Sequence, residues 1–339
     1  MNPPRLGFVG LGWIGAMRLQ ALVKAGAAEV AALCESVPDR LAQTGDAHPQ
    51  AARFADYEEM IERAGDLGLD GVVIATPNAL HAPQTLAALE RGLAVFCQKP
   101  LAINAREARQ MVDAARDADR LLGVDYSYRF TDGARELRRR IQAGELGRIF
   151  SLDLAFHNAY GPDKPWCFDP RLSGGGALMD LGVHLIDLAF WLLNDPPVRR
   201  VRGAVFRKGE RLSLGRMTPT GQVGVEDFAS GWLDLHGGDT VASLAVSWNV
   251  HAGRDCVIRA AAFGTEGGAE FRNVGGSFYD FELERFSGRS GEIVTRESKD
   301  WLGRAILDWS RRLAESKRFD PEIERSVRVS EVVDGIYGR

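Results

Sequence analysis

One stretch of the chain combines residue types that can move a proton. Residues 173–187 begin with a serine and three glycines and continue into a mostly apolar run that carries Asp180, His184 and Asp187. At about 100° per residue, these three side chains share one stripe of a helix. A histidine whose ring reaches carboxylates can take up and release a proton near neutral pH. Taken alone, the pattern fits a solvated helix face equally well, so the rest of the chain has to decide.

A glycine-rich turn follows the first expected strand, residues 6–9. In such a turn the first glycine permits the tight bend, the second lets the backbone approach a pyrophosphate, and the third lets helix and strand pack closely. The helix that follows presents unpaired N–H groups to the phosphate charge. The pattern favours dinucleotide binding over a purely structural bend, and the expected contacts are Gly10, Gly12, Trp13, Ile14 and Gly15.

Glu35 supports the same prediction and indicates which dinucleotide is preferred. It lies 20 residues beyond Gly15, just after the second expected strand. A carboxylate there accepts hydrogen bonds from the adenosine ribose hydroxyls and repels a 2′-phosphate. This favours NAD over NADP as the cofactor. NADP remains the alternative, because Ser36 and Arg40 are close enough in sequence to contact a phosphate.

The order of the elements predicts the fold. Over the first 125 residues, short apolar runs alternate with helical patterns, which is typical of a parallel sheet wrapped by helices. The second half shows period-two alternation instead, which predicts an open, mostly antiparallel sheet with the helix of Asp180 and His184 on one face. Strands are expected at residues 6–9, 30–34, 71–75, 94–97 and 121–124, and then at 149–157, 201–206, 228–235, 240–249, 257–263 and 279–286.

We therefore predict an α/β chain of two domains. Residues 1–124 form an NAD(P)-binding Rossmann domain with a doubly wound parallel sheet. Residues 125–339 form an α+β domain with a large open, mostly antiparallel sheet, which serves substrate binding and oligomerisation. C-terminal helices near residues 301–316 and 322–337 are expected to pack back on the first domain.

Composition narrows the class of partner. A net charge of −4 and an isoelectric point near 5.9 argue against nucleic acid or an anionic membrane. The four cysteines form no Cys-x-x-Cys pair, so neither a zinc site nor a disulfide framework is expected. The N-terminus has no apolar signal core, and the apolar run near residues 185–193 is too short to span a membrane. We expect a cytoplasmic protein.

Two further segments follow the third and fourth expected strands, where a doubly wound sheet presents its ligand site. One is residues 75–81 and the other is Gln98-Lys99-Pro100. Together with the glycine-rich turn and the triple glycine with its aspartate and histidine, they make the chain resemble the glucose–fructose oxidoreductase / inositol dehydrogenase / rhizopine-catabolism (Gfo/Idh/MocA) family. The motifs occur in the family's order. The likeness runs through nearly the whole chain, with Trp166 ahead of the triple glycine and Val225-Glu226-Asp227 after it.

The resemblance implies roles for individual residues. The family's Glu-Lys-Pro pattern implies that Lys99 is catalytic at the nicotinamide end of the cofactor. The Asp-x-x-x-His pattern implies the same for Asp180 and His184, with the histidine as proton acceptor. Gln98 departs from the family's glutamate: it keeps a carbonyl acceptor but loses a charge beside Lys99, which leaves the cofactor's ribose contacts open. The segment that passes along the cofactor matches Thr76, Pro77, Asn78 and His81, and the cofactor contacts also include Gln98 and Lys99.

Other residues near these motifs have two interpretations each. Substrate contacts are expected from Lys99, Asp180 and His184, whereas Asp187 is expected to support the helix rather than to react. For the remaining candidates, packing is the alternative to substrate binding. They are Tyr126, Tyr128, Arg129, His157, Tyr160 and Trp166, of which Tyr126, Arg129 and Trp166 are taken as substrate-binding.

The resemblance also implies an activity. It is that of an NAD(P)-dependent dehydrogenase, which transfers hydride between a nicotinamide cofactor and a secondary alcohol or ketone of a sugar, cyclitol or related polyol. Family members commonly form dimers or tetramers through the sheet of the second domain. Two alternatives remain open on the same fold: an NAD-retaining glycosidase or epimerase-like enzyme, and a non-catalytic NAD-sensing regulatory protein.

Overall fold

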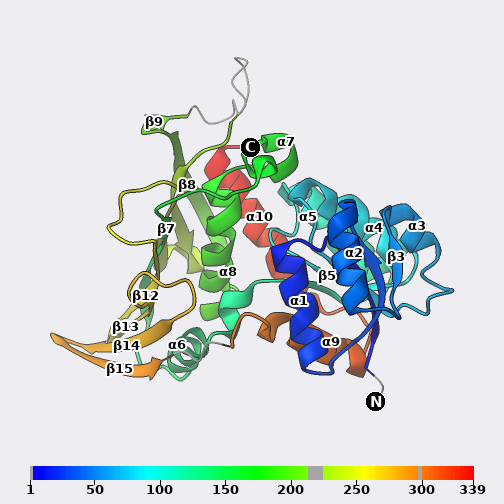
Figure 1. Cartoon of the computed structure of the whole chain (residues 1–339). Helices are drawn as coiled ribbons and strands as arrows, with labels where there is room; N and C mark the ends of the chain where they lie inside the picture. The colour runs from blue at the N-terminus through cyan, green and yellow to red at the C-terminus, as the bar shows by residue number, and fades with distance from the viewer. Residues whose placement is uncertain (1–2, 213–223, 297–299) are drawn as a thin grey trace. The chain divides into compact units, whose positions relative to one another are not determined.

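The computed structural model describes residues 3–212, 224–296 and 300–339, which form two compact units (Figure 1). The first unit contains the chain up to Asp125 and the segment Gly303–Val327. The second contains Tyr126–Leu302 and Arg328–Arg339. The first boundary lies next to the expected division after residue 124. Residues 303–327 also belong to the first unit, which the expected division did not include.

The first unit is built on six parallel strands in the order β3-β2-β1-β4-β5-β6. This is the doubly wound Rossmann order, in which ligands bind beyond the carboxyl ends of the strands at the point where the order reverses, here between β1 and β4. The strands are β1 (Arg5–Val9), β2 (Glu29–Cys34), β3 (Ala52–Phe54), β4 (Gly71–Ile74), β5 (Ala94–Cys97) and β6 (Leu122–Val124), and the helices between them are α1 (Trp13–Lys24), α2 (Pro38–Ala47), α3 (Tyr57–Glu62), α4 (His81–Glu90) and α5 (Ala105–Asp117).

Two elements of this unit, α2 and β3, are not predicted by the sequence patterns above. β3 is only three residues long, which is too short for an alternation to be recognised. α2 begins with Pro38 at its first turn, a position that suits proline because the missing N–H would have no helical partner there. That proline is a local signal from which the helix could have been predicted.

Trp309 attaches the helix α9 (Arg304–Glu315) to the sheet of the first unit. The centroid of its ring lies 5.5 Å from that of Phe96 on β5. A Cβ atom at Gly123 on β6 would come within 2.6 Å of the Trp309 ring, so a glycine is needed for this approach. The segment that carries α9 therefore packs on the first unit, as expected for the C-terminal helices.

The last helix, α10 (Glu324–Tyr337), corrects the expectation that both C-terminal helices pack on the first domain. Val327 lies in the core of the first unit, but from Arg328 onward the helix belongs to the second unit. The physical reason is its packing on the large sheet: a Cβ atom at Gly203 would come within 2.5 Å of Ile336.

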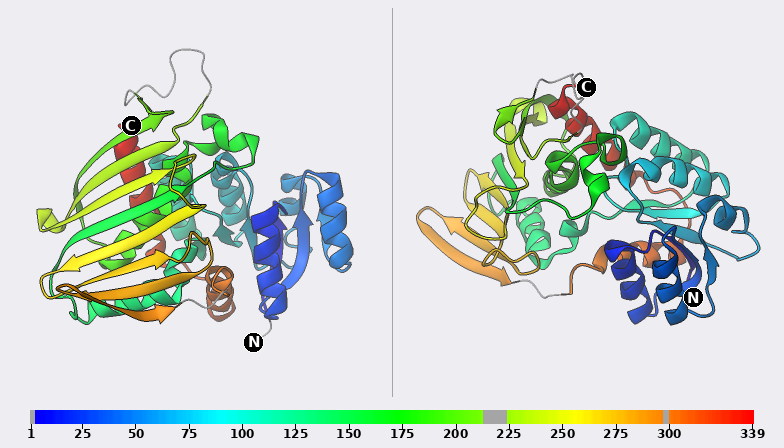
Figure 2. Two further views of the ribbon diagram at one scale, coloured as in Figure 1. Left: turned by 60° about the vertical axis from the view of Figure 1, so that its left-hand side comes forward. Right: turned by 45° about the horizontal axis from the view of Figure 1, so that its top comes forward.

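The second unit is built on a nine-stranded sheet in the order β15-β14-β13-β12-β7-β11-β10-β8-β9. β7 and β11 are parallel, and the other neighbours are antiparallel, as expected. The left view of Figure 2 shows this sheet with α10 behind it. The strands are β7 (Ile149–Asn158), β8 (Val198–Arg207), β9 (Glu210–Arg211), β10 (Phe228–Leu235), β11 (Thr240–Ser247), β12 (Cys256–Gly264), β13 (Gly268–Asn273), β14 (Phe281–Ser287) and β15 (Ser290–Arg296).

The helix that carries Asp180 and His184 lies in the core of the second unit. It consists of a π-helical turn, η4 (Leu178–Gly182), followed by α8 (Val183–Leu192), whose ten residues are all buried. α8 packs against β7, and η4 packs against β11. Within the described residues, Pro170–Leu192 is the one helical stretch long and apolar enough to cross a membrane, but 89% of its apolar window is buried inside the protein, as in a core helix.

Candidate active site

The glycine-rich turn of the first unit has the shape that a pyrophosphate requires. Gly10 has a φ of +81°, and a Cβ atom on it would lie 2.6 Å from the carbonyl oxygen of Ala75. A Cβ atom on Gly12, by contrast, would have nothing within 4 Å, so there is open space beside its backbone. No side chain caps the start of α1 at Gly12, which leaves the N–H groups of its first turn to a ligand. The residues present therefore fit a dinucleotide phosphate group.

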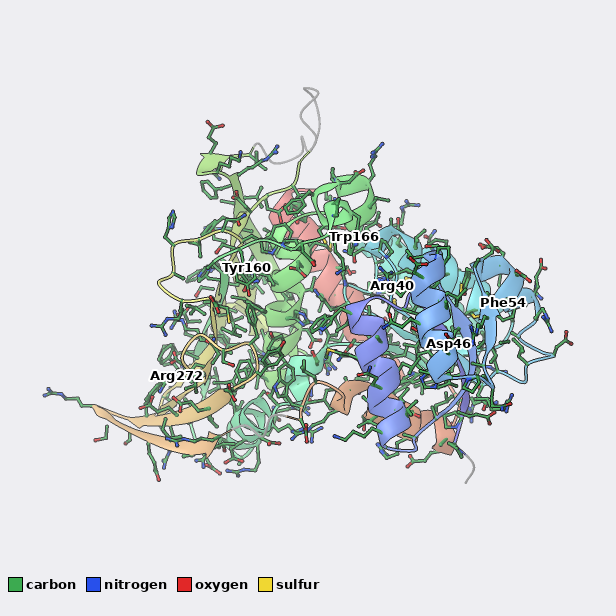
Figure 3. All side chains as sticks on the ribbon, viewed as in Figure 1. Arg40, Asp46, Phe54, Tyr160, Trp166 and Arg272 are labelled. Carbon is green, nitrogen blue, oxygen red and sulfur yellow. The ribbon has the colours of Figure 1, made fainter. Side chains whose placement is uncertain are left out.

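Glu35 is held beside this turn by hydrogen bonds from two backbone N–H groups and from side chains. Its carboxylate accepts from the backbone N–H of Leu11 (2.9 Å) and of Val37 (3.0 Å) and from Nη1 of Arg40 (2.9 Å). Burial alone raises the pKa of Glu35, but the hydrogen bonds from Val37, Arg40 and Leu11 outweigh burial, and its pKa lies below the usual value. The side chain is therefore ionised beside the glycine-rich turn. Arg40, labelled in Figure 3, supplies a cation that offsets its charge.

The cofactor residues expected from the next two segments also come from the carboxyl ends of strands. Thr76, Pro77 and Asn78 follow β4, and Gln98 and Lys99 follow β5, which pairs with β4 in parallel. The carboxyl ends of parallel neighbours lie at one edge of the sheet, so these segments meet the glycine-rich turn that follows β1. The first unit thus assembles the expected cofactor residues from distant parts of the sequence.

His81 requires a correction, because it does not line the cofactor site. Its ring is completely buried. Its Nδ1 lies 2.7 Å from the carbonyl oxygen of Pro100, and its Nε2 lies 3.0 Å from that of Thr76. Burial lowers the pKa of His81 below its usual value. The histidine therefore holds the segments after β4 and β5 together instead of contacting the cofactor.

The triple glycine in the second unit is required by two close approaches. Gly174 has a φ of +79° and ends the short helix α7 (Pro170–Ser173). A Cβ atom on Gly175 would lie 2.1 Å from the hydroxyl oxygen of Tyr337, and one on Gly176 would lie 1.8 Å from the backbone oxygen of Glu226. The glycines therefore let the start of the helix pack directly against these two residues.

Glu226 is a site residue whose role sequence reasoning missed. Its buried carboxylate accepts hydrogen bonds from the backbone N–H groups of Gly176 and Leu178, both at 2.9 Å, and from the Tyr337 hydroxyl at 2.7 Å. Burial raises the pKa of Glu226, and these hydrogen bonds act in the opposite direction. The side chain thus accepts hydrogen bonds from the N-terminal N–H groups of the helix that carries Asp180 and His184. The only signal for it was its position in the run Val225-Glu226-Asp227.

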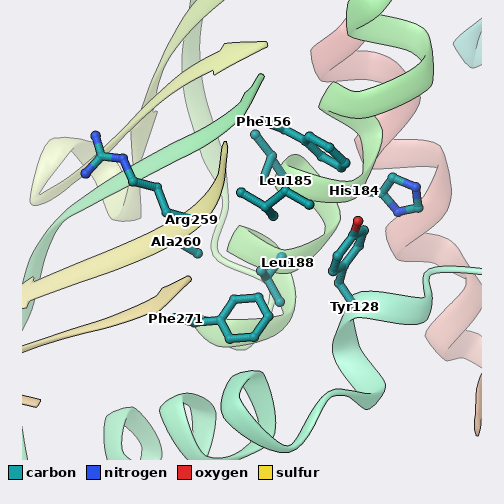
Figure 4. Close-up of a pocket in the computed structure, with 9 residues that line it drawn as sticks. Tyr128, Phe156, His184, Leu185, Leu188, Arg259, Ala260 and Phe271 are labelled. Carbon is teal, nitrogen blue, oxygen red and sulfur yellow. The ribbon is translucent and has the colours of Figure 1, made fainter. Parts of the chain in front are cut away.

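His184 is packed between aromatic rings rather than exposed on a solvated helix face. It is 8% exposed, and Tyr128 meets it edge to face with ring centroids 5.0 Å apart. The hydroxyl end of Tyr128 points toward His184 in Figure 4, which shows a cavity between these two residues and the sheet. Burial raises the pKa of Tyr128 above its usual value, so its hydroxyl keeps its proton. The cavity is lined by Tyr128, Phe156, His184, Leu185, Leu188, Ile258, Arg259, Ala260 and Phe271.

Tyr126 and Arg129 both belong to the support of this helix. Arg129 donates from Nε to Oδ2 of Asp187 at 2.5 Å and forms a second bond to Oδ1. Its guanidinium lies 5.3 Å from the centroid of the Tyr126 ring, and that ring meets His184 edge to face at 6.3 Å. Asp187 is 1% exposed, so it has the supporting role expected of it. These contacts favour the packing interpretation, and the substrate contacts of Tyr126 and Arg129 stay predictions.

Asp180 is oriented by Trp248, which the sequence analysis did not select. Nε1 of Trp248 donates to Oδ2 of Asp180 at 3.1 Å. The ring of Phe168, from the segment before α7, packs edge to face on Trp248 at 5.8 Å. Trp166 and Tyr160, labelled in Figure 3, lie on the same segment. Trp166 keeps its predicted substrate contact as a prediction.

His157 lies on the opposite face of the sheet from this helix. Phe156, its neighbour on β7, lines the cavity beside His184, and adjacent strand residues point to opposite faces. Nδ1 of His157 lies 2.8 Å from Oγ of Ser247, and its ring stacks on Phe228. Of the two interpretations of His157, these contacts favour packing.

Two sequence profiles of one family match the chain in succession. The profile described as an oxidoreductase family with an NAD-binding Rossmann fold matches residues 4–126. The profile described as the GFO/IDH/MocA C-terminal domain matches residues 134–270. The two matches cover the glycine-rich turn and Lys99 in the first unit, and Asp180 and His184 in the second.

Curated and solved proteins show the same likeness. The chain is 26% identical over 317 residues to a D-glucoside 3-dehydrogenase of Escherichia coli (strain K12), which covers 91% of this chain and 84% of that protein. It is 30% identical over 280 residues to a 1,5-anhydro-D-fructose reductase of Ensifer adhaerens, over 80% of this chain and 76% of that protein. In fold it is similar to an aldose-aldose oxidoreductase from Caulobacter crescentus complexed with glycerol, with a TM-score of 0.83 and 23% identity over 99% of this chain and 96% of that one.

We expect the protein to lose stability as the pH falls below about 6.5, in part through His81. Because burial holds the pKa of His81 below its usual value, the unfolded chain binds a proton at a higher pH than the folded chain does. The contribution of a neutral His81 is complete above the unfolded pKa and declines below it. The fall in Tm between pH 7.5 and pH 5.5 should therefore be smaller in His81→Asn than in the unsubstituted chain.

His48→Asn provides the control, since His48 is only partly buried at the end of α2. Its fall in Tm should equal that of the unsubstituted chain. An equal fall in His81→Asn would contradict the assignment of this pH dependence to His81.

Proposed function

This chain belongs to the Gfo/Idh/MocA family of oxidoreductases, and we propose that it transfers hydride between NAD and a secondary alcohol of a sugar, cyclitol or related polyol. The observation that carries the proposal is the helix of the second unit. It presents Asp180 and a nearly buried His184 at a start fixed by Glu226. The names of the relatives, a glucoside dehydrogenase and an anhydrofructose reductase, support the same substrate class.

In the proposed reaction, His184 accepts the hydroxyl proton of the substrate. The imidazole is held edge to face against Tyr128, which fixes the direction from which the ring receives that proton. Lys99 donates a hydrogen bond to the same substrate oxygen and stabilises the negative charge that develops on it. Asp180, oriented by Trp248, positions the substrate or the imidazole. A bound oxidised nicotinamide would supply the hydride acceptor for the carbinol carbon, so that the alcohol would become a ketone while His184 holds the proton.

Loss of His184 should slow turnover by roughly 10²–10⁴-fold, which is the usual contribution of a general base. His184→Asn is the test, with NADH formation measured at 340 nm across a panel of sugars and polyols. His236→Asn is the matched control, because His236 lies exposed between β10 and β11 and should leave the rate unchanged.

Three outcomes would count against this assignment. A loss below tenfold in His184→Asn at saturating substrate would contradict the role of His184 as proton acceptor. Product formation without net NADH would favour the NAD-retaining alternative, and tight NAD binding with no turnover of any alcohol or ketone would favour a sensing protein.

We propose NAD rather than NADP as the preferred cofactor, because the ionised Glu35 is placed for ribose hydroxyls and opposes a 2′-phosphate. Glu35→Ala should weaken NAD binding by roughly 10- to 100-fold, as expected for a lost hydrogen bond to a charged group. It should weaken NADP binding less. Arg40→Ala should lower the affinity for NADP more than for NAD, because Arg40 is the cation nearest to that carboxylate. Isothermal titration of both nucleotides measures this, and equal effects of Glu35→Ala on both would contradict the preference.

We propose that the chain forms a homodimer or homotetramer through the face of the large sheet that α8 leaves uncovered. Trp232 on β10 lies on that face and is 44% exposed. Arg202 on β8 and Ser243 on β11 pair with Trp232 and share this face. Ala245, two residues after Ser243 on β11, lies on the same face. A sheet face with an exposed tryptophan beside small and charged residues suits another copy of the same face.

Ala245→Arg should convert this oligomer to a monomer in light scattering, because a long charged side chain would stand in the centre of the face. Val23→Glu, at an exposed position of α1 in the first unit, is the control and should leave the mass unchanged. A monomeric unsubstituted chain, or an unchanged mass in Ala245→Arg, would contradict the proposed interface.

We also propose that the protein works in the cytoplasm. Its four cysteines are free, and Cys34, Cys97 and Cys256 are buried. Burial raises the pKa of Cys34 and of Cys256 to about 12, so these thiols stay protonated and inert. Reduced thiols and a nicotinamide substrate pool are both features of that compartment.

A further inference from the structure

The glutamine that replaces the family's glutamate is bonded to a buried acid. Nε2 of Gln98 donates to Oδ2 of Asp125 at 2.5 Å, and both side chains are buried. Gln98 follows β5, and Asp125 follows β6, its parallel neighbour. The backbone N–H of Asp125 donates to the carbonyl oxygen of Cys97, directly before Gln98. The two side chains therefore meet at the carboxyl edge of the sheet, next to Lys99.

This contact fixes which way the amide of Gln98 points. An ionised carboxylate only accepts hydrogen bonds, so the NH₂ group of Gln98 must face Asp125 and its carbonyl oxygen must face away. A glutamate at position 98 would instead set two carboxylates against each other, and one of them would have to take up a proton or move. An amide at position 98 and a carboxylate at position 125 are thus complementary choices.

Arg18 holds Asp125 from the other side. Its Nε donates to the same Oδ2 atom at 2.5 Å, and the two side chains are 3% and 0% exposed. Arg18 lies on α1, the helix that begins at the phosphate-binding turn. A buried pair of this kind is weak evidence for stability, but removal of one partner leaves a buried charge uncompensated. The pair therefore ties the helix of the phosphate site to the segment that carries Lys99.

The cluster keeps spare hydrogen-bonding capacity. Among the residues that the structure describes, neither Nη1 of Arg18 nor Oδ1 of Asp125 has a hydrogen-bond partner, although both atoms are buried. Buried polar atoms are nearly always paired, and exceptions call for an explanation beyond fold stability. A group retained here only for packing would be better served by apolar side chains of the same volume.

We propose that Asp125 supplies, in this chain, the carboxylate that the Glu-Lys-Pro pattern places before the lysine. Asp125 and Arg18 are positioning residues: they hold the Gln98 amide so that its carbonyl oxygen faces the ribose at the nicotinamide end, beside Lys99. Compared with the Glu-Lys-Pro pattern, the carboxylate stands at position 125 instead of position 98, and an amide stands at position 98. This inference rests on the proposed function only in requiring that the chain binds a nicotinamide dinucleotide.

Single substitutions test the two halves of this arrangement, with the Kd for NAD and the Tm as readouts. Gln98→Glu should raise the Kd at pH 8 at least tenfold. The Kd should return toward the unsubstituted value at pH 6, because two carboxylates in contact raise one pKa and a proton then bridges them. The charged groups around position 98 are Arg18 and Asp125, with Lys99 next in the chain. Gln98→Ala, which removes the amide without adding charge, should raise the Kd several-fold at both pH values.

The decisive experiment exchanges the two groups. Asp125→Asn alone should lower the Tm, because Arg18 loses its buried counter-charge. The double variant Gln98→Glu/Asp125→Asn restores one carboxylate and one amide in contact, so its Kd at pH 8 should return to within threefold of the unsubstituted chain. Gln142→Glu is the matched control: its amide donates to the carbonyl oxygen of Leu192 in the second unit, so the substitution should affect the Tm but not the Kd.

Each other outcome overturns a defined statement. A double variant that binds NAD no better than Gln98→Glu overturns the exchange of acid and amide. A Kd that stays unchanged in Gln98→Glu at pH 8 while only the Tm falls overturns the positioning role and leaves a structural one. An unsubstituted chain that binds neither NAD nor NADP overturns the proposed function itself, which separates that failure from the other two.

Discussion

The buried carboxylate of Glu226 is the interaction on which the candidate site of the second unit depends. The first N–H groups of a helix have no partners within the helix, and a negative group beside them is favourable. Glu226 serves two of them and receives the hydroxyl of Tyr337, so the start of the helix, the strand region before β10 and the C-terminal helix are fixed to one another. The triple glycine exists because this junction leaves no room for side chains. Two turns further on, the same helix presents His184.

Ion pairs away from the reacting atoms set the geometry in both units. Arg129 forms an ion pair with Asp187 on the helix of His184, and Arg18 forms an ion pair with Asp125 beside the segment of Lys99. Because burial of two charges costs about as much as their attraction returns, neither pair is an argument for high stability. Each pair restricts its two side chains to a single orientation, because a shift of either partner would leave a buried charge unpaired. Each unit therefore uses a buried ion pair to orient the segment that carries a predicted site residue.

Local signals predicted the elements of the site, and long-range contacts decided what each side chain does there. The glycine-rich turn, the strand ends that carry Lys99 and the helix of His184 were all predicted, because their patterns lie within a few adjacent residues. Arg129 and Asp187 are 58 positions apart, so no local pattern predicts that they bind each other. His81 was misassigned for the same reason: its carbonyl partners come from two loops that only the folded sheet brings together. The packing of α10 was predicted incorrectly, because the sequence pattern of an amphipathic helix does not indicate which of two apolar surfaces the helix covers.

The environment of Asp180 connects its helix to a segment outside the helix. Asp180 receives its hydrogen bond from Trp248, and Trp248 is packed under Phe168 from the segment before α7. Because Phe168 packs on the indole, the position of the indole depends on the side chain at residue 168. A hydrogen bond of ordinary strength tolerates only a narrow range of donor angles, so Asp180 must follow. The position of Asp180, a predicted substrate contact, therefore depends on a segment outside its own helix, the segment that also carries Tyr160 and Trp166.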